Sequence, residues 1–388
     1  MPATEEPANR FHHLVVEGRR FGRRAVGAVR RRLTETSPAA DVTGFYGAGD
    51  PGPGAAGEVL AFEPQTTPDG APTGTEAWRV RYRTFDAADR PVTASMSVAV
   101  PPGGGTDRPV VVWVHGAVGV CAGCGPSRTG FDAWYAAPLL AAGVVVAAPD
   151  LTGLGIDGPF HPYLHGTTAG RSVLDAARAA AARPAWGAGR LVAIAGHSAG
   201  GHAVLWANQL AVGAQDLDVR LAVPIAPVGD LRIAMEHYAR TSGMAAFPVQ
   251  LAATWPAVEP VVAGDVLTPA ALERLDALAT KRLFGLQLLF KGPADRWVRP
   301  GALQAGAWAA AIERQSAGRQ PGAAPVRFVH GDDDPDVLVQ WTKQLHAEMV
   351  AAGHDATLQV HLGAGHMSIR EAATDDVVAE LLAAVDRG

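Results

Sequence analysis

The chain has 388 residues, of which 48% are hydrophobic and 18% are charged. This balance is typical of a folded globular protein and excludes a disordered linker or tail. The formal net charge of −5 provides no basic field for a phosphate backbone, so no nucleic acid is expected as a partner.

Residues 1–40 contain eight Arg and four Glu and show no strong apolar periodicity, which predicts a basic extension ahead of the folded core. The pair Arg19-Arg20 is not followed by the apolar stretch that an export signal requires. We therefore expect a cytoplasmic protein, with an extracellular one as the alternative if the true start site differs. No apolar run approaches the roughly 18 residues of a transmembrane segment, so none is predicted.

After a Gly- and Pro-rich loop at 41–57, short strand-like runs alternate with helical patterns. The strand-like runs lie at 78–85, 92–100, 110–114, 144–148, 191–195, 219–225, 326–329 and 357–361. The helical patterns lie at 131–142, 171–182, 199–212, 337–352 and 369–385. This alternation predicts an α/β fold with a mostly parallel central sheet and helices on both faces.

The alternation is interrupted once. Residues 228–322 carry helical signals, among them 230–240, a Thr268-Pro269 start and 303–314, but no convincing strand. They predict a helical cap inserted between two parts of the core, residues 41–227 and 323–388.

The strand-like run 191–195 leads into Gly196-His197-Ser198-Ala199-Gly200, and a helical pattern follows. G-x-S-x-G between a strand and a helix is the signature of a nucleophile elbow, in which a sharp turn presents the serine hydroxyl above the sheet. The sequence therefore predicts Ser198 as a nucleophile. The Ala199 N–H, at the start of the helix, is expected to bind an oxyanion.

A serine nucleophile needs a base and an acid, which in this arrangement follow it in the order acid, then histidine. The turn after 326–329 holds four aspartates, of which Asp334 has the usual spacing from Gly331 and Val337. The turn after 357–361 carries His366 between Gly365 and the last helical pattern. We predict Asp334 as the acid and His366 as the base that act with Ser198. We interpret His330 as a structural or surface residue.

A second oxyanion donor is expected from the loop after 110–114, and we select the Ala117 N–H because Gly116 lets a substrate come close. His115 is expected to shape this loop by hydrogen bonding.

With these motifs in place, the chain resembles the α/β-hydrolase superfamily and, within it, the secretory lipases and esterases of actinobacteria and fungi. The resemblance covers about residues 41–388. The further motifs that carry it are G-F-Y at 44–46, H-G at 115–116, C-G-P-S at 124–127, P-D-L-T-G-L-G at 149–155, H-P-Y at 161–163 and L-D-A-A-R at 174–178. It implies a Ser-His-Asp enzyme with a helical lid that hydrolyses esters, acting on a small ester or a lipid. The family is typically exported, and this chain departs from it in lacking the apolar stretch.

Other signals are set aside. The G-x-G-x-x-G at 153–158 runs into Pro159 and Pro162 and not into a phosphate-binding helix, so no dinucleotide cofactor is predicted. Cys121 and Cys124 suit a redox pair or half a zinc site, but no second pair completes four ligands. We interpret them as ordinary thiols and predict no metal.

The sequence thus predicts a serine ester hydrolase of the lipase or carboxylesterase type. An acyltransferase that uses the same acyl-enzyme and a serine peptidase remain as alternatives. No oligomeric state is predicted.

Overall fold

The computed structural model describes residues 39–41, 43–131 and 133–386. Apart from residues 39 and 40, the predicted basic extension lies outside these ranges.

A single nine-stranded sheet forms the centre of the described chain, in the order β1-β2-β3-β5-β4-β6-β7-β8-β9. The strands β1 to β3 and β5 pair antiparallel in succession, whereas β5, β4 and β6 to β9 pair parallel. The strands are β1 (Val59–Pro64), β2 (Glu76–Phe85), β3 (Pro91–Val100), β4 (Arg108–Val114), β5 (Val145–Pro149), β6 (Ala188–His197), β7 (Asp218–Ile225), β8 (Val326–Gly331) and β9 (Ala356–His361).

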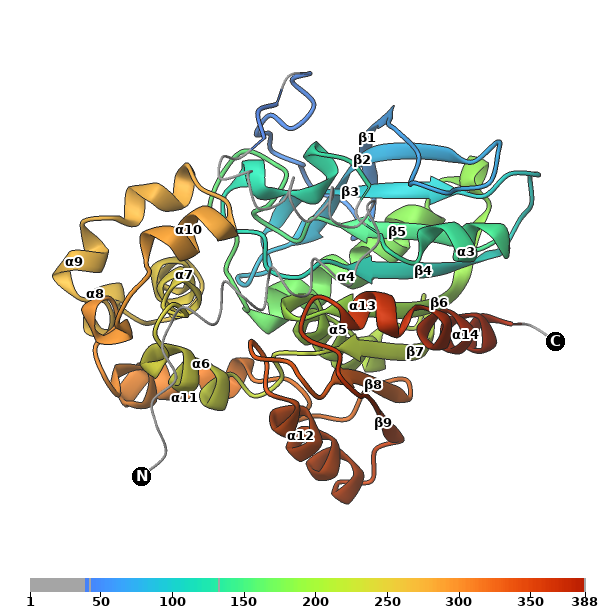
Figure 1. Ribbon diagram of the computed structural model, residues 1–388. Helices are drawn as coiled ribbons and strands as arrows, with labels where there is room; N and C mark the ends of the chain where they lie inside the picture. Colours follow the sequence, from blue (N-terminus) through green and yellow to red (C-terminus); the bar gives the residue numbers. More distant parts are fainter. Residues whose placement is uncertain (1–38, 42, 132, 387–388) are drawn as a thin grey trace.

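Helices cover both faces of the sheet (Figure 1). On one face lie α4 (Gly166–Ala181), α5 (Ala199–Leu210) and α12 (Val339–Ala351), and on the other lie α3 (Ala136–Ala141), α13 (Ile369–Ala372) and α14 (Thr374–Val385). The side chains of β4 alternate between the two cores: Val112 packs beneath α4 and α5, and Trp113 packs against α3. A parallel strand buried on both faces needs an unbroken apolar run, which explains the valine-rich sequence of β4.

The predicted α/β fold with a mostly parallel sheet is confirmed, but several boundaries differ. The edge strand β1 was not predicted, because its residues are only partly buried and its apolar run is short. The helix predicted at 131–142 begins only at Ala136, because Pro138 is tolerated in a first turn but not in a helix interior. The helix α4 begins five residues earlier than predicted, because the His165 side chain accepts a hydrogen bond from Thr168 N and caps it.

The helix predicted at 369–385 is in fact two helices, α13 and α14, which meet at Ala373. Its φ of −102° and ψ of 7° take the backbone out of the helical region at this point.

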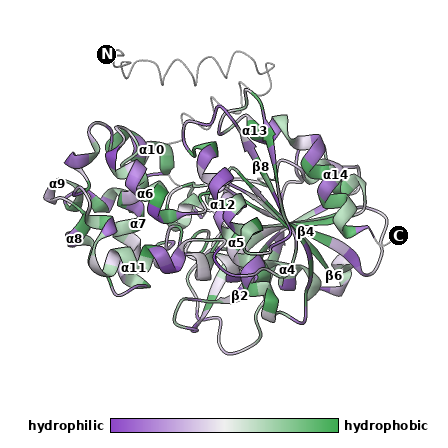
Figure 2. Ribbon diagram, turned by 90° about the horizontal axis from the view of Figure 1, so that it is seen from below, coloured by the Kyte–Doolittle hydropathy of each residue, from purple (hydrophilic) through white to green (hydrophobic). Residues whose placement is uncertain are grey.

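The residues between β7 and β8, which we call the helical insertion (residues 226–325), contain helices and one isolated bridge between Leu267 and Val298. The insertion has a hydrophobic core of its own, in which the rings of Trp255 and Trp308 stack 6.1 Å apart. Its α-helices are α6 (Leu231–Arg240), α7 (Ala246–Thr254), α8 (Ala263–Val266), α9 (Pro269–Leu272), α10 (Leu283–Leu289) and α11 (Gly306–Gln315). In Figures 1 and 2 these helices form a separate group beside the sheet, beyond the carboxyl ends of the parallel strands.

Within the described ranges, none of the helices combines the length and the hydropathy that crossing a bilayer requires.

Candidate active site

Ser198 lies in the sharp turn between β6 and α5, with φ at 59° and ψ at −117°. Positive φ is strained for a residue with a side chain, and such strain persists only where the surrounding structure holds it. Here the Ser198 N–H donates to the Ile225 carbonyl at 2.8 Å, and the Ser198 carbonyl accepts from Val228 N at 3.3 Å. Both ends of the strained residue are therefore fixed, one to the end of β7 and the other to the segment that follows it.

The glycines on either side of Ser198 are required by space. A Cβ on Gly196 would lie 2.6 Å from the Gly200 carbonyl oxygen, and one on Gly200 would lie 2.3 Å from the Val114 carbonyl oxygen. No side chain fits at either position unless the helix moves away from the sheet. The first turn of α5 therefore packs directly on β4.

The structure brings Ser198, Asp334 and His366 together, although they lie far apart in the sequence. His366 Nε2 lies 3.0 Å from Ser198 Oγ, and His366 Nδ1 lies 2.7 Å from Asp334 Oδ2. Both distances are those of hydrogen bonds. The imidazole thus links the hydroxyl to the carboxylate in the arrangement of a nucleophile, a base and an orienting acid.

Asp334 is buried and surrounded by donors. Its Oδ1 accepts from the N–H groups of Asp336 and Val337, each at 2.9 Å, and its Oδ2 also lies 3.3 Å from His330 Nε2. Burial alone would raise the pKa of Asp334. The positive charge on His366 and the hydrogen bonds from His330, His366 and Val337 outweigh burial and hold this pKa well below its ordinary value. Asp334 therefore carries its negative charge at any pH near neutrality.

The charge of Asp334 acts in turn on His366. Burial disfavours a charged imidazole, but the carboxylate beside it prevails and raises the pKa of His366 above its ordinary value of 6.5. The neighbouring His197 behaves in the opposite way. Burial, together with the positive charge of His366, holds the pKa of His197 well below the ordinary value, so this ring stays neutral.

Two loops at the ends of β8 and β9 hold Asp334 and His366 at their separation. Asp332 N donates to the His361 carbonyl at 3.2 Å, and Asp333 N donates to the Ala364 carbonyl at 3.1 Å. The Asp332 carboxylate accepts from Gly363 N at 2.6 Å. Asp332 and Asp333, two of the aspartates that competed with Asp334 in the sequence, therefore bind one loop to the other, whereas Asp334 hydrogen-bonds to the His366 ring.

The loop after β4 runs beside Ser198. A Cβ placed on Gly116 would lie 3.5 Å from Ser198 Cβ, so this loop adjoins the serine. The side chain of His115 shapes it as expected, with Nδ1 2.6 Å from the Gly116 carbonyl and Nε2 3.2 Å from the Asp150 carbonyl. Among the described residues, the Ala117 N–H has no hydrogen-bond acceptor.

Ala199 is the first residue of α5, and the Ser198 hydroxyl does not cap this helix. The N–H groups of a first helical turn have no partner inside the helix, so the uncapped N-terminus of α5 can receive negative charge.

The helical insertion covers the site. Ala117 and Ala199 both pack against its hydrophobic core, and Ser198 is only 9% exposed. Besides the bond from Val228 N to the Ser198 carbonyl, further hydrogen bonds connect the insertion to the loops of the site. Leu283 N, at the start of α10, donates to the Val118 carbonyl at 3.0 Å, and the Tyr238 hydroxyl in α6 donates to the Asp336 carbonyl at 2.9 Å.

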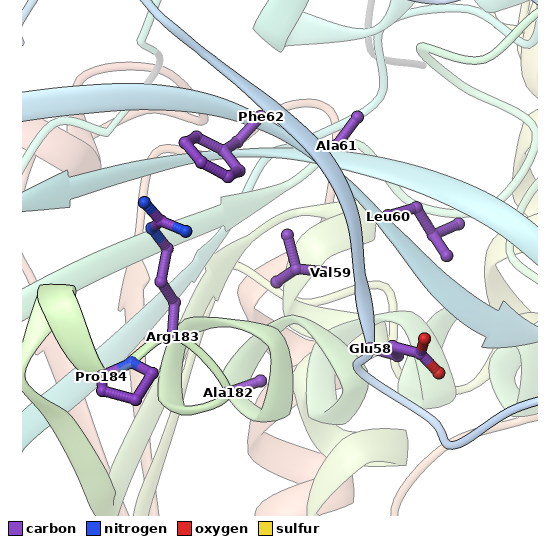
Figure 3. Close-up of a pocket in the computed structure, with 8 residues that line it drawn as sticks. All are labelled: Glu58, Val59, Leu60, Ala61, Phe62, Ala182, Arg183 and Pro184. Carbon is purple, nitrogen blue, oxygen red and sulfur yellow. The ribbon is translucent and has the colours of Figure 1, made fainter.

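A surface pocket of about 340 Å³ lies elsewhere, between β1 and the end of α4 (Figure 3). It is lined by Glu58, Val59, Leu60, Ala61, Phe62, Ala182, Arg183 and Pro184, none of which contributes to the serine site. The described residues contain no group of three or more His, Cys, Asp or Glu side chains that could hold a metal ion.

Two histidines of the site were not recognised from the sequence. His197 Nε2 lies 2.7 Å from the His366 carbonyl, and the two rings are 4.6 Å apart. His330 is fully buried against Asp334, so of the two roles we considered for it, structural or surface, only the structural one holds. The position of His330 at the end of β8, four residues before Asp334, was the sequence signal that could have identified it as a neighbour of Asp334. For His197 there was none, because 169 residues separate it from its partner.

The fold also occurs in solved structures of esterases and lipases. The rice cell wall degrading esterase LipA from Xanthomonas oryzae is 19% identical, with a TM-score of 0.73 over 86% of this chain and 100% of that one. Candida antarctica lipase A is 18% identical, with a TM-score of 0.67 over 85% of this chain and 80% of that one. A putative hydrolase from Legionella pneumophila is 18% identical, with a TM-score of 0.66 over 81% of this chain and 90% of that one. At these identities, the likeness shows the fold.

A search of curated protein sequences finds no match. The model of the alpha/beta hydrolase family matches residues 111–380, which span β4 to α14 and include the elbow and both partner loops. This match confirms the resemblance to α/β hydrolases read from the sequence. The chain therefore belongs to the alpha/beta hydrolase family.

Proposed function

We propose that the protein is a serine hydrolase that cleaves carboxylic esters through an acyl-enzyme on Ser198. The observation that carries the proposal is the hydrogen-bonded chain from Ser198 Oγ through His366 to Asp334. The esterase and the lipase among the solved structures of the same fold support an ester as the substrate.

In the proposed mechanism, His366 Nε2 takes the proton of Ser198 Oγ as the oxygen attacks the ester carbonyl. The same proton then passes to the leaving alcohol, and an acyl-enzyme remains. Water, deprotonated by His366, attacks the acyl carbonyl and releases the acid. Asp334 holds the His366 Nδ1–H in place and stabilises the positive charge that the ring carries between proton transfers.

The oxyanion of each tetrahedral intermediate is proposed to bind the N–H groups of Ala199 and Ala117. Ala199 begins α5, whose dipole favours negative charge at this end. The Ala117 N–H has no acceptor among the described residues and lies in the loop that adjoins Ser198. Preorganised donors of this kind act on the transition state, because the negative charge develops there.

The helical insertion is proposed to act as a lid with an apolar inner surface. Its hydrophobic core reaches Ala117 and Ala199, so the acyl group of a substrate would lie against apolar side chains. This supports an ester with a hydrophobic acyl part, as in carboxylesterases and lipases.

The test is the hydrolysis of p-nitrophenyl esters from acetate to palmitate by the full chain. We expect Ser198→Ala and His366→Ala each to reduce kcat by roughly four to six powers of ten, as is found when a catalytic triad is broken. The exposed Ser242 provides a matched control, and Ser242→Ala is expected to leave the rate unchanged.

Labelling with a fluorophosphonate gives a second readout that does not depend on the choice of ester. The wild type should be labelled on Ser198, and Ser198→Ala should not. A Ser198→Ala protein that retained full esterase activity would refute the proposal. Labelling without turnover of any ester would instead favour acyl transfer or peptide cleavage by the same serine.

A further inference from the structure

The thiols of Cys121 and Cys124 are in contact beside the loop that carries Ala117. Their Sγ atoms lie 3.2 Å apart, and both are free thiols in buried residues. They are the two cysteines of the chain, so any disulfide within one molecule must join them.

The backbone holds the two residues in a tight turn. Cys121 precedes a short 3₁₀ helix that ends at Cys124, and Cys124 N donates to the Cys121 carbonyl at 2.8 Å. Gly155 N fixes the middle of the turn by donating to the Ala122 carbonyl at 2.9 Å. An S–S bond is about 2.05 Å long, so its formation requires the sulfur atoms to approach by roughly 1 Å.

The pair also contacts the loop of the candidate site and the insertion. A Cβ on Gly119 would lie 2.6 Å from Cys124 Sγ, so this sulfur fills the space beside Gly119. The same sulfur lies 3.8 Å from the carbonyl of Lys281, two residues before the start of α10. Movement of Cys124 Sγ therefore changes the packing of both the loop of Ala117 and the helix that covers it.

We propose that Cys121 and Cys124 form a reversible dithiol–disulfide site, oxidised by low-molecular-weight disulfides, whose state sets the position of the loop that carries Ala117. The proposal that a Cys121–Cys124 disulfide forms does not depend on the proposed function, whereas its effect on ester turnover rests on that function.

In the proposed reaction, the Cys121 thiolate attacks one sulfur of the external disulfide and expels a thiolate, which leaves a mixed disulfide. Cys124 then loses its proton and attacks the Cys121 sulfur, and the second external thiol leaves. Two cysteine thiols are oxidised, and one external disulfide is reduced to two thiols. Cys121 is the attacking residue because it is the more exposed of the two, at 6% against 0%. The hydrogen bond from Cys124 also lowers the pKa of the Cys121 thiol.

The test uses the reduced full chain in buffers with increasing ratios of oxidised to reduced glutathione. The protein is then unfolded, alkylated with N-ethylmaleimide and weighed by intact mass spectrometry. We expect a species lighter by two hydrogen atoms and without alkyl groups, which dithiothreitol converts back to a dialkylated chain. Cys121→Ser cannot form it. Recovery of two alkylated thiols at every ratio, or of a persistent glutathione adduct, would overturn the site.

Esterase activity is measured on the same samples. We expect a several-fold lower kcat and little change in KM for the oxidised wild type, because an oxyanion donor acts mainly in the transition state. Cys121→Ser should not respond to glutathione. A disulfide that forms without a change in kcat would overturn the link to the loop. If neither redox state hydrolyses any ester, the proposed function fails, while the mass measurement still decides on the disulfide.

Discussion

His366 has a hydrogen-bond partner on each ring nitrogen, and the two partners are suited to opposite charge states of the ring. In the proposed mechanism Ser198 loses its proton only to a neutral ring, whereas the Asp334 carboxylate favours a protonated one. The same carboxylate that orients the base therefore raises the pKa above which the base can act.

The first prediction follows from that raised pKa. As the pH falls through the pKa of His366, the ring becomes charged and the rate of ester hydrolysis falls. We expect the midpoint of this acid limb above pH 6.5, the ordinary value for a histidine. The measurement is kcat/KM against pH, which reports the free enzyme. An acid limb centred below 6.5 would contradict the assignment.

The second prediction concerns His330, which we expect to position Asp334. His330→Phe removes the Nε2 group, which lies 3.3 Å from Asp334 Oδ2 and 2.9 Å from the Val337 carbonyl, and we expect kcat to fall about tenfold, in line with the loss of one hydrogen bond to a charged group. With one donor fewer, Asp334 acts more strongly on His366, so the acid limb should move to higher pH. His330→Gln, which can present an N–H near the same place, should restore part of the rate.

Comparing the pH profiles of wild type and His330→Phe shows whether His330 positions Asp334 or only supports the fold. If His330→Phe lowers only the thermal stability and leaves the acid limb where it was, His330 supports the fold without positioning Asp334.

At the scale of elements, the elbow depends on the close contact of α5 with β4. Gly200 lies in the first turn of α5, and the carbonyl oxygens of Val114 and His115 occupy the space that a side chain would need. The helix end that is proposed to receive the oxyanion is therefore set by packing against the sheet.

The third prediction is that Gly200→Ala destabilises the protein by roughly 1–3 kcal/mol, the usual cost of overpacking. Gly213→Ala is the matched control, because a Cβ there meets no atom within 4 Å. Urea unfolding of both variants measures the difference. Equal stability of the two variants would show that α5 can move away from β4 at little cost.

The elements and site residues that the sequence predicted are those with local signals. The elbow around Ser198 and the spacing from Gly331 to Asp334 each lie within a few residues, so the pattern is visible without coordinates. Edge strand β1 was missed because it is short and half-exposed. The contact of His197 with the His366 carbonyl depends on how distant loops pack, and no pattern in a single chain records that.

At the scale of the whole molecule, a buried carboxylate joins the helical insertion to the core. Glu259 of the insertion lies 3.5 Å from His165 Nε2, at the start of α4, and it accepts hydrogen bonds from Arg314 and Gln315. Burial would raise the pKa of Glu259, but the hydrogen bonds from His165, Arg314 and Gln315 lower it to about 2.

The fourth prediction is that Glu259→Gln lowers the free energy of unfolding at pH 7 by about 1.5–3 kcal/mol. This is the range for a hydrogen bond to a charged group. A carboxylate with a lowered pKa contributes stability above its unfolded value of 4.5 and loses it as the pH falls toward about 2. The difference between wild type and variant should therefore shrink over that range. Unfolding midpoints measured from pH 7 to 2 provide the test, and a difference independent of pH would refute it.

The order of the site along the chain has a consequence for protein synthesis. His366 follows Ser198 by 168 residues, with the whole helical insertion between them, and it also follows Asp334 by 32. A nascent chain on the ribosome therefore contains Ser198 and Asp334 before His366 has been translated. Because β9 pairs only with β8, the base reaches the serine when this last strand docks. A chain that terminates before His366 thus lacks the imidazole that contacts Ser198, and under the proposed mechanism its serine is not activated.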